Sequence, residues 1–138
     1  MSLLLEIITP EKIVFRDEID EAIAPTVNGE ITILPHHIGL ITQVVPGELI
    51  IKKNNKNQSI AVTEGFLEVS DNRISILANY AINAENINVA KAEEAKKRAE
   101  HLMQEKTTDR DFRIAEGELR KAILELKIAN KHRKRITL

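Results

Sequence analysis

The chain has 138 residues, a formal net charge of −1, and neither cysteine nor tryptophan. The lack of cysteine excludes a disulfide framework, a thiolate metal site and a cysteine nucleophile. Three Phe and one Tyr are too few for a base-stacking platform, so the core must consist of Ile, Leu, Val and Ala. No apolar run approaches the ~18 residues that span a bilayer, and the N-terminus lacks the basic segment of a secretory signal. We therefore expect a soluble protein of one or two small domains.

Charge is distributed unevenly along the chain. Residues 1–87 hold six Lys or Arg and twelve Asp or Glu, a net charge of −6, whereas residues 88–138 hold fourteen and nine, a net charge of +5. From Arg120 onward, seven basic residues face one acidic residue, Glu125. Surfaces of opposite sign indicate two different partners or two different tasks.

The first 84 residues have the pattern of an all-β domain. Short apolar or alternating runs follow one another in the order LLLEII, KIVF, EITIL, LITQVV, ELIIKK, QSIAV, FLEV and RISILA. The turn segments NGE, PGE, KNNKN and SDN separate them. Many short strands without a helical period between them predict an antiparallel β-sandwich or flattened barrel.

Three polar features of this half invite a functional interpretation. The acidic run DEIDE at 17–21 is typical of a strand edge that charge protects against pairing, and a metal site there would need carboxylates that converge. Glu30 follows Gly29 at a hairpin tip, where a solvated carboxylate is the simplest reading. His36 and His37 are adjacent, so their side chains diverge; we expect a surface contact rather than one shared metal.

After Asn88 the apolar period becomes helical. Asn86 or Asn88 can cap a first helix, and Thr108 or Asp109 can cap a second helix after the break KTTDRDF. The two predicted helices form an antiparallel hairpin over residues 85–138, which makes the fold class α+β. Its expected seam consists of Ala92, Ala95, Ala99 and Leu102 in the first helix and of Phe112, Ala115, Leu119, Ala122, Leu126 and Ala129 in the second.

The composition of this seam predicts a weakly held hairpin. A buried methyl group contributes about 0.8 kcal/mol, whereas a buried Leu side chain contributes about 1.5 to 3 kcal/mol. Isolated helices of about fifteen residues are marginally stable in water. We therefore expect the hairpin to open or to move to another surface.

The basic run KHRKR at 131–135 is the densest charge cluster in the chain. It is compatible with a solvated tail, with an acidic protein partner, or with phosphate. A nucleic-acid adaptor stays open on this run alone, although no nucleic-acid motif surrounds it. A small hydrolase has less support, because the chain has no GxSxG elbow, no HExxH and no phosphate-binding glycine-rich loop.

The order of the motifs resembles a known family. IITPEKIVF, NGEITILPHHIGL and EGFLEVSDNRISILA, followed by an Ala-rich basic hairpin, are similar to the epsilon subunit of the bacterial F-type ATP synthase over essentially the whole chain. The resemblance implies a non-catalytic subunit of the central stalk with no cofactor or metal of its own. Residues 1–84 would bind the gamma subunit and the c-ring. Residues 85–138 would regulate, permitting ATP hydrolysis when folded and inhibiting it when extended against a catalytic beta subunit.

The resemblance also assigns contact residues. Glu30 and His37 match positions near the c-ring and gamma contacts, and His36 stands where the family commonly has glycine. Arg120, Lys121, Lys131, Arg133 and Lys134 are the basic groups expected against beta in the extended state. No nucleic-acid partner is implied. The protein would act in proton- or sodium-driven ATP synthesis, peripherally at the cytoplasmic face of a bacterial inner membrane rather than in a plastid.

One departure concerns ATP, which some bacterial members bind through the motif I/L-D-x-x-R-A at the start of the first helix. Here the matching stretch is INVAKA, so Asn88 replaces the acid and Lys91 the arginine. Glu125 and Lys121 stand where arginines are found in the second helix. Lys lacks the forked geometry of Arg and Glu125 would repel phosphate, so weak or absent ATP binding is expected.

Overall fold

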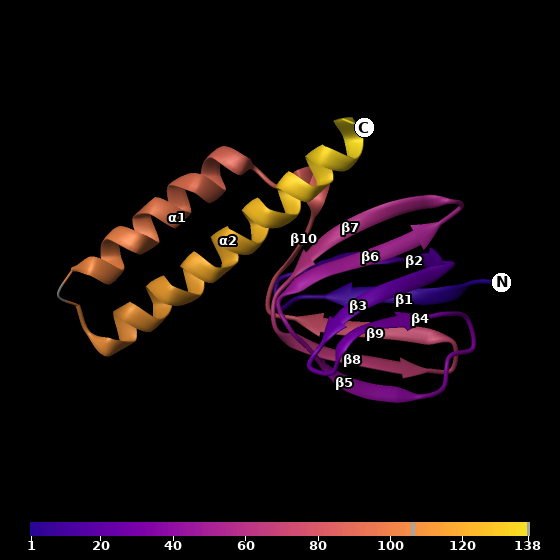
Figure 1. Ribbon diagram of the computed structural model, residues 1–138. Helices are drawn as coiled ribbons and strands as arrows, with labels where there is room; N and C mark the ends of the chain where they lie inside the picture. Colours follow the sequence, from indigo (N-terminus) through magenta and orange to yellow (C-terminus); the bar gives the residue numbers. More distant parts are fainter. Residues whose placement is uncertain (106, 138) are drawn as a thin grey trace. The chain divides into compact units, whose positions relative to one another are not determined.

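The computed structural model describes residues 1–105 and 107–137. It contains two compact units, Met1–Asn83 and Ala84–Leu138. Strands make up the first unit, and a helical hairpin follows in the second (Figure 1). This confirms the predicted α+β fold class.

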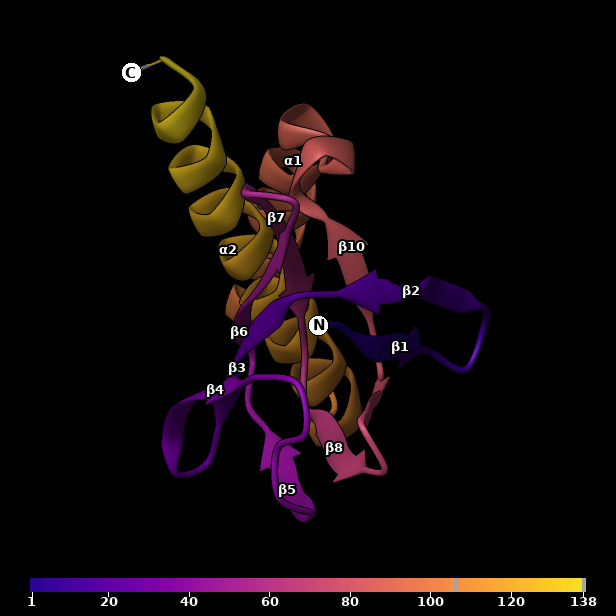
Figure 2. The same cartoon turned by 90° about the vertical axis from the view of Figure 1, so that its right-hand side faces the viewer.

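The first unit is a single sheet that curls into a sandwich-like, nearly closed barrel. Its order is β10-β7-β6-β3-β5-β8-β9-β1-β2, with β4 paired to β3. Pairing is antiparallel except between β1 and β9, and Figure 2 shows β1 and β2 as neighbours joined by a short connection. The strands are β1 (Leu3–Ile8), β2 (Ile13–Ile19), β3 (Glu21–Thr26), β4 (Gly29–Ile33), β5 (Leu40–Val44), β6 (Gly47–Lys53), β7 (Lys56–Val62), β8 (Gly65–Ser70), β9 (Arg73–Ala78) and β10 (Ala81–Asn83).

The core of the first unit consists of aliphatic side chains, as the composition predicts. In β1, Leu3, Leu5 and Ile7 are buried and the residues between them are less so, which is the alternation of a strand with one face inward. The same alternation in β8 and β9 buries further Leu, Val and Ile. The opposite faces of these strands are therefore left for other contacts.

Strand β3 is the main element that the hydrophobic pattern did not reveal. Its sequence EAIAPT is rich in Ala and contains Pro25, residue types that are depleted in strands. It nevertheless lies inside the sheet, where it pairs with β4, β5 and β6. Pro25 has no N–H to donate, but its carbonyl accepts a hydrogen bond from the Val45 N–H at 3.2 Å. Tertiary pairing therefore overrides the local propensity.

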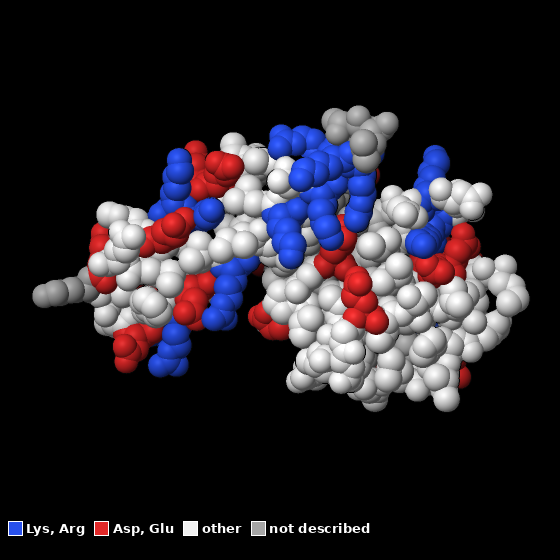
Figure 3. Space-filling view, in the orientation of Figure 1, with Lys and Arg blue, Asp and Glu red and all other residues white. Residues whose placement is uncertain are grey.

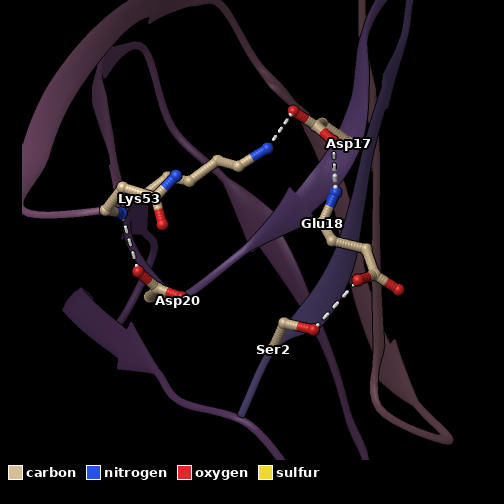
Figure 4. Close-up of polar contacts among 6 residues, drawn as sticks. Ser2, Asp17, Glu18, Asp20 and Lys53 are labelled. Carbon is tan, nitrogen blue, oxygen red and sulfur yellow. Dashed lines mark hydrogen bonds and ion pairs between the residues drawn. The ribbon is translucent and has the colours of Figure 1, made fainter.

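Side chains of the acidic run at 17–21 form polar contacts with neighbouring segments of the first unit (Figure 4). Asp17 lies on β2, the terminal strand of the sheet order, and forms an ion pair with Lys53 at 2.6 Å. Asp20 accepts a hydrogen bond from the Asn54 N–H at 2.9 Å. The hydrogen bond from Lys53, with a second from the Glu18 N–H, holds the pKa of Asp17 below its ordinary value. The run is thus a charged edge that contacts the β6–β7 hairpin.

The predicted polar hairpin tips are tight turns. Asn54 and Asn55 between β6 and β7, and Asp71 and Asn72 between β8 and β9, all have positive φ. Two consecutive positive φ values are the requirement of a type I′ turn, and Asn and Asp tolerate it better than most residues. These turns set the register of both hairpins.

The second unit contains a short 3₁₀ turn, η1 (Ala84–Asn86), and two antiparallel helices, α1 (Val89–Gln104) and α2 (Asp109–Thr137), seen side by side in Figure 1. The Asn88 side chain caps α1 by accepting from the Lys91 N–H at 3.0 Å. The Thr108 hydroxyl accepts from the Asp111 N–H at 3.1 Å. In each case one of the two candidate caps is the residue used.

Alanine forms the centre of the contact between the helices. Ala92 and Ala99 of α1 and Ala115 and Ala122 of α2 are buried. The prediction was wrong for the two large residues next to the connection between the helices, because Leu102 and Phe112 are 40% and 38% exposed. Within the described part of the hairpin, the one large side chain that is fully buried is Ile128 of α2, which the predicted seam did not include.

Gly65, the first residue of β8, carries the sharpest steric constraint in the sheet. A Cβ at this position would collide with the Leu77 carbonyl oxygen and lie 2.8 Å from the Ala78 Cα. Both atoms belong to the backbone of β9, so neither can turn aside as a side chain would.

We expect Gly65→Ala to lower the free energy of unfolding by about 1 to 3 kcal/mol, because β8 and β9 must separate locally. Urea denaturation measures this change. The matched control is Gly117→Ala in α2, where a Cβ meets nothing within 4 Å; alanine there should stabilise by about 0.5 to 1 kcal/mol. Unchanged stability of Gly65→Ala would contradict the packing described.

Candidate functional site: partner-binding surfaces

An apolar surface lies on the outward side of β5, β8 and β9. The strand register places Gln43, Phe66 and Leu77 in one row across the three strands. Phe66 and Leu77 are 56% and 55% exposed, and Ile41 on β5 is 74% exposed. A cluster of large aliphatic and aromatic side chains in water indicates a surface that another protein covers. We call Ile41, Phe66 and Leu77 the outer-face patch.

A groove of about 580 Å³ lies next to this patch and shares Phe66 and Leu77 with it. Its walls are mainly apolar and come from β1, β5, β8, β9 and the loops beside them; they include Ile8, Val27, Val45, Pro46, Phe66 and Leu77. Gly65 lies at its edge, so the close approach of β8 to β9 also shapes the groove. The groove can accept apolar side chains of a partner.

The two histidines lie in the loop between β4 and β5. The Leu34 carbonyl accepts a hydrogen bond from the His37 N–H at 3.1 Å, which closes a four-residue turn. Pro35 is the second residue of this turn, and His36 is the third and has φ 63. This is a type II turn, whose third residue requires positive φ. Glycine adopts that conformation without strain, so the histidine found here is accommodated at a cost of about 1 to 2 kcal/mol.

The ring of His37 has a defined role in this loop. Its Nδ1 lies 2.7 Å from the Ile38 carbonyl oxygen. A carbonyl only accepts, so Nδ1 carries the proton and donates.

Among the residues that the structure describes, no three His, Cys, Asp or Glu side chains are grouped to hold a metal ion.

Glu30 and His37 occupy opposite ends of β4. Glu30 is the second residue of the strand and is exposed, whereas His37 is half-buried in the loop beyond its last residue. The two predicted contact residues therefore lie at separate places on the surface of the first unit.

A small cavity of about 280 Å³ lies between α1 and α2, at the position where the ATP motif was considered. Its walls include three cations, Lys91, Arg98 and Lys121, and two carboxylates, Glu118 and Glu125. Asn88 is occupied as the helix cap. The carboxylates offset most of the positive charge, so the cavity is a poor match for a triphosphate.

Basic side chains form a stripe along one face of α2. Heptad spacing keeps residues on one side of a helix, and Arg113, Arg120, Lys127 and Lys134 are each seven residues apart. Lys131 lies on the same face. All five are exposed, and Lys and Arg side chains gather over the last turns of α2 (Figure 3). We call these five residues the α2 basic stripe.

The stripe differs from the set expected from sequence. Arg120, Lys131 and Lys134 belong to it, whereas Lys121 lines the cavity between the helices. Arg133 lines a second cavity, with Glu85 and Glu93, and donates to the Asn130 side chain at 3.1 Å. Arg113 and Lys127 were missed, although their heptad spacing was visible in the sequence. Arg120 also forms an ion pair with Glu116 at 2.8 Å.

Comparison with known proteins agrees with this two-part organisation. The family model described as "ATP synthase, Delta/Epsilon chain, beta-sandwich domain" matches residues 2–84. The model described as "ATP synthase, Delta/Epsilon chain, long alpha-helix domain" matches residues 85–130. Among solved structures, a chain of the Euglena gracilis mitochondrial ATP synthase has a TM-score of 0.65 at 19% identity, covering 98% of this chain and 81% of its own. At that identity the likeness concerns the fold.

Sequence relatives are closer. The ATP synthase epsilon chain of Dehalococcoides mccartyi is 44% identical over 133 residues, which is 96% of this chain and 95% of the relative. That of Herpetosiphon aurantiacus is 40% identical over 135 residues, 98% of this chain and 99% of the relative. With both family models matched in order, the chain belongs to the ATP synthase epsilon chain family.

Proposed function

We propose that this epsilon chain links the gamma subunit to the c-ring and restrains ATP hydrolysis through its helical hairpin. The catalytic chemistry resides in its partners, and the chain contributes no catalytic residue. The observation that carries the proposal is the pairing of an alanine seam, which gives the hairpin a low cost of release, with the α2 basic stripe.

The first unit supplies the fixed attachment. Its aliphatic core is continuous and its outer-face patch and groove present apolar surface to a partner, which we assign to gamma. Glu30, at the far end of β4 from His37, is assigned to the polar rim near the c-ring. No helix within the described residues is both long enough and apolar enough to cross a membrane. We propose that the chain associates with the cytoplasmic face of a bacterial inner membrane through its partners in the complex.

The second unit supplies the regulation. An extended α2 would present the basic stripe to carboxylates of a catalytic beta subunit, where charge complementarity favours association. Each exposed ion pair formed with beta is worth about 0.2 to 1 kcal/mol, and it favours the extended state only by the amount that it exceeds a pair already made in the folded hairpin, such as Arg120 with Glu116. A net difference of about 1 kcal/mol would change the extended population about fivefold.

The deletion of residues 88–138 tests the inhibitory role. We expect the reconstituted complex to hydrolyse ATP faster with the truncated chain, because the inhibitory element is gone. Replacement of the five α2 basic stripe residues by Gln should reproduce most of the increase without removing a helix. The matched control replaces Lys97 and Arg98 of α1 by Gln. Unchanged hydrolysis in the truncated complex would contradict inhibition, while attachment through the first unit could still hold.

We also propose that ATP binds weakly or not at all. Calorimetric titration of the full chain should show no binding in the micromolar range, because Glu118 and Glu125 oppose phosphate in the cavity between the helices. A variant carrying Asn88→Asp, Lys91→Arg, Lys121→Arg and Glu125→Arg restores the charges of ATP-binding members and is expected to gain affinity. Micromolar affinity of the unaltered chain would overturn the proposal.

A further inference from the structure

Ile38 is the most exposed large apolar side chain of the β unit apart from Met1, at 80%. It lies in the loop between β4 and β5, directly after the type II turn at Leu34–His37. A flexible loop would lose conformational entropy on binding, which reduces what an exposed isoleucine contributes. Whether Ile38 can act as an anchor therefore depends on how firmly the loop is held.

Three hydrogen bonds hold this loop in place. The turn closes from the His37 N–H to the Leu34 carbonyl at 3.1 Å. The His37 ring donates to the carbonyl of Ile38 itself at 2.7 Å. The His36 N–H donates to the Asn72 side-chain oxygen at 2.8 Å, which links the loop to the β8–β9 turn. The backbone of the loop from Leu34 to Ile38 is thus held in place before a partner binds.

Asn72 connects this loop to two other segments. Its side-chain amide donates to the Ser2 carbonyl at 2.8 Å, and its own carbonyl accepts from the Leu4 N–H at 3.2 Å. It is half-buried and holds φ 59, the second positive value of the type I′ turn. One side chain therefore joins the N-terminus, the β8–β9 turn and the β4–β5 loop.

We propose that Ile38 is an apolar anchor for the gamma subunit and that Asn72 is the residue that positions it; this rests on the proposed function. The assignment to gamma follows from continuity, since β5 begins two residues after Ile38 and carries Ile41 of the outer-face patch. An exposed isoleucine gains free energy only against an apolar partner surface, which is also what the outer-face patch requires. Ile38 thus extends that patch beyond the edge of the sheet.

Binding of the full-length chain to purified gamma, measured by calorimetry, tests the anchor. Ile38→Ala should raise the dissociation constant for gamma about tenfold or more. Ile38→Val should raise it less, because most of the apolar area remains. Failure of the unaltered chain to bind gamma would remove the proposed function itself. Binding by the unaltered chain with less than a twofold effect of Ile38→Ala would overturn only the anchor. The anchor would also be overturned if Ile38→Ala weakened binding to the c-ring and left binding to gamma unchanged.

Asn72→Gly tests the positioning role, because glycine keeps the positive φ and removes both side-chain hydrogen bonds. We expect weaker gamma binding, by about threefold to tenfold, together with a fall in melting temperature of several degrees from the two lost hydrogen bonds. Asn55→Gly is the matched control, since Asn55 has φ 63 in the equivalent type I′ turn of the β6–β7 hairpin. Asn72→Asp keeps the acceptor for His36 and should restore much of the affinity.

A double-mutant cycle separates positioning from a general structural role. If Asn72 acts through Ile38, Asn72→Gly should cost little further affinity once Ile38 is already Ala. Additive losses in the double variant, or equal losses in Asn55→Gly, would overturn the assignment of Asn72.

Discussion

The alanine seam between α1 and α2 is the constraint on which the behaviour of this protein depends. Each buried alanine methyl contributes about 0.8 kcal/mol, and Ala92, Ala99, Ala115 and Ala122 form the centre of the contact. Ordering helix backbone costs about 1 to 2 kcal/mol per residue before hydrogen bonds and packing offset it. We propose that a hairpin held in this way keeps its helices close together and releases them at a small cost in free energy.

The first unit has the opposite energetic character. Its core consists of Leu, Ile and Val from nearly every strand, and the close approach at Gly65 leaves no room for rearrangement between β8 and β9. A rigid unit can keep an apolar surface such as the outer-face patch exposed without collapsing onto it. The protein thus combines a unit with a large aliphatic core and a hairpin whose contact is rich in alanine, and the proposed regulation by movement rests on this difference.

The sequence predicts much of this fold because local signals agree with the global one. Asn54–Asn55 and Asp71–Asn72 are strong turn formers, and Asn88 and Thr108 are strong helix caps. Strand β3 was missed because Ala and Pro25 carry little strand signal, and only its partners in the sheet explain its conformation. Local pattern cannot supply such pairing.

The candidate surfaces were less predictable than the fold. The residue types showed that the second half is basic. The face of α2 on which each residue lies determines the rest: Arg113 and Lys127 belong to the α2 basic stripe, whereas Lys121 lines a cavity. The glycine that the family commonly has at position 36 pointed to an unusual turn there, and His36 adopts φ 63. Residue order alone does not reveal that Asn72, distant in sequence, holds the backbone of this turn. Such relations depend on three-dimensional proximity.

Native-state amide hydrogen exchange of the isolated chain tests the central claim most directly. Exchange should be slow in the central strands of the first unit and much faster across residues 89–130, because the hairpin opens without unfolding the sheet. Replacement of Ala99 and Ala122 by Gly should accelerate exchange in both helices and leave the strands unchanged. Uniformly strong protection of the helices, equal to that of the core strands, would contradict a hairpin poised for release.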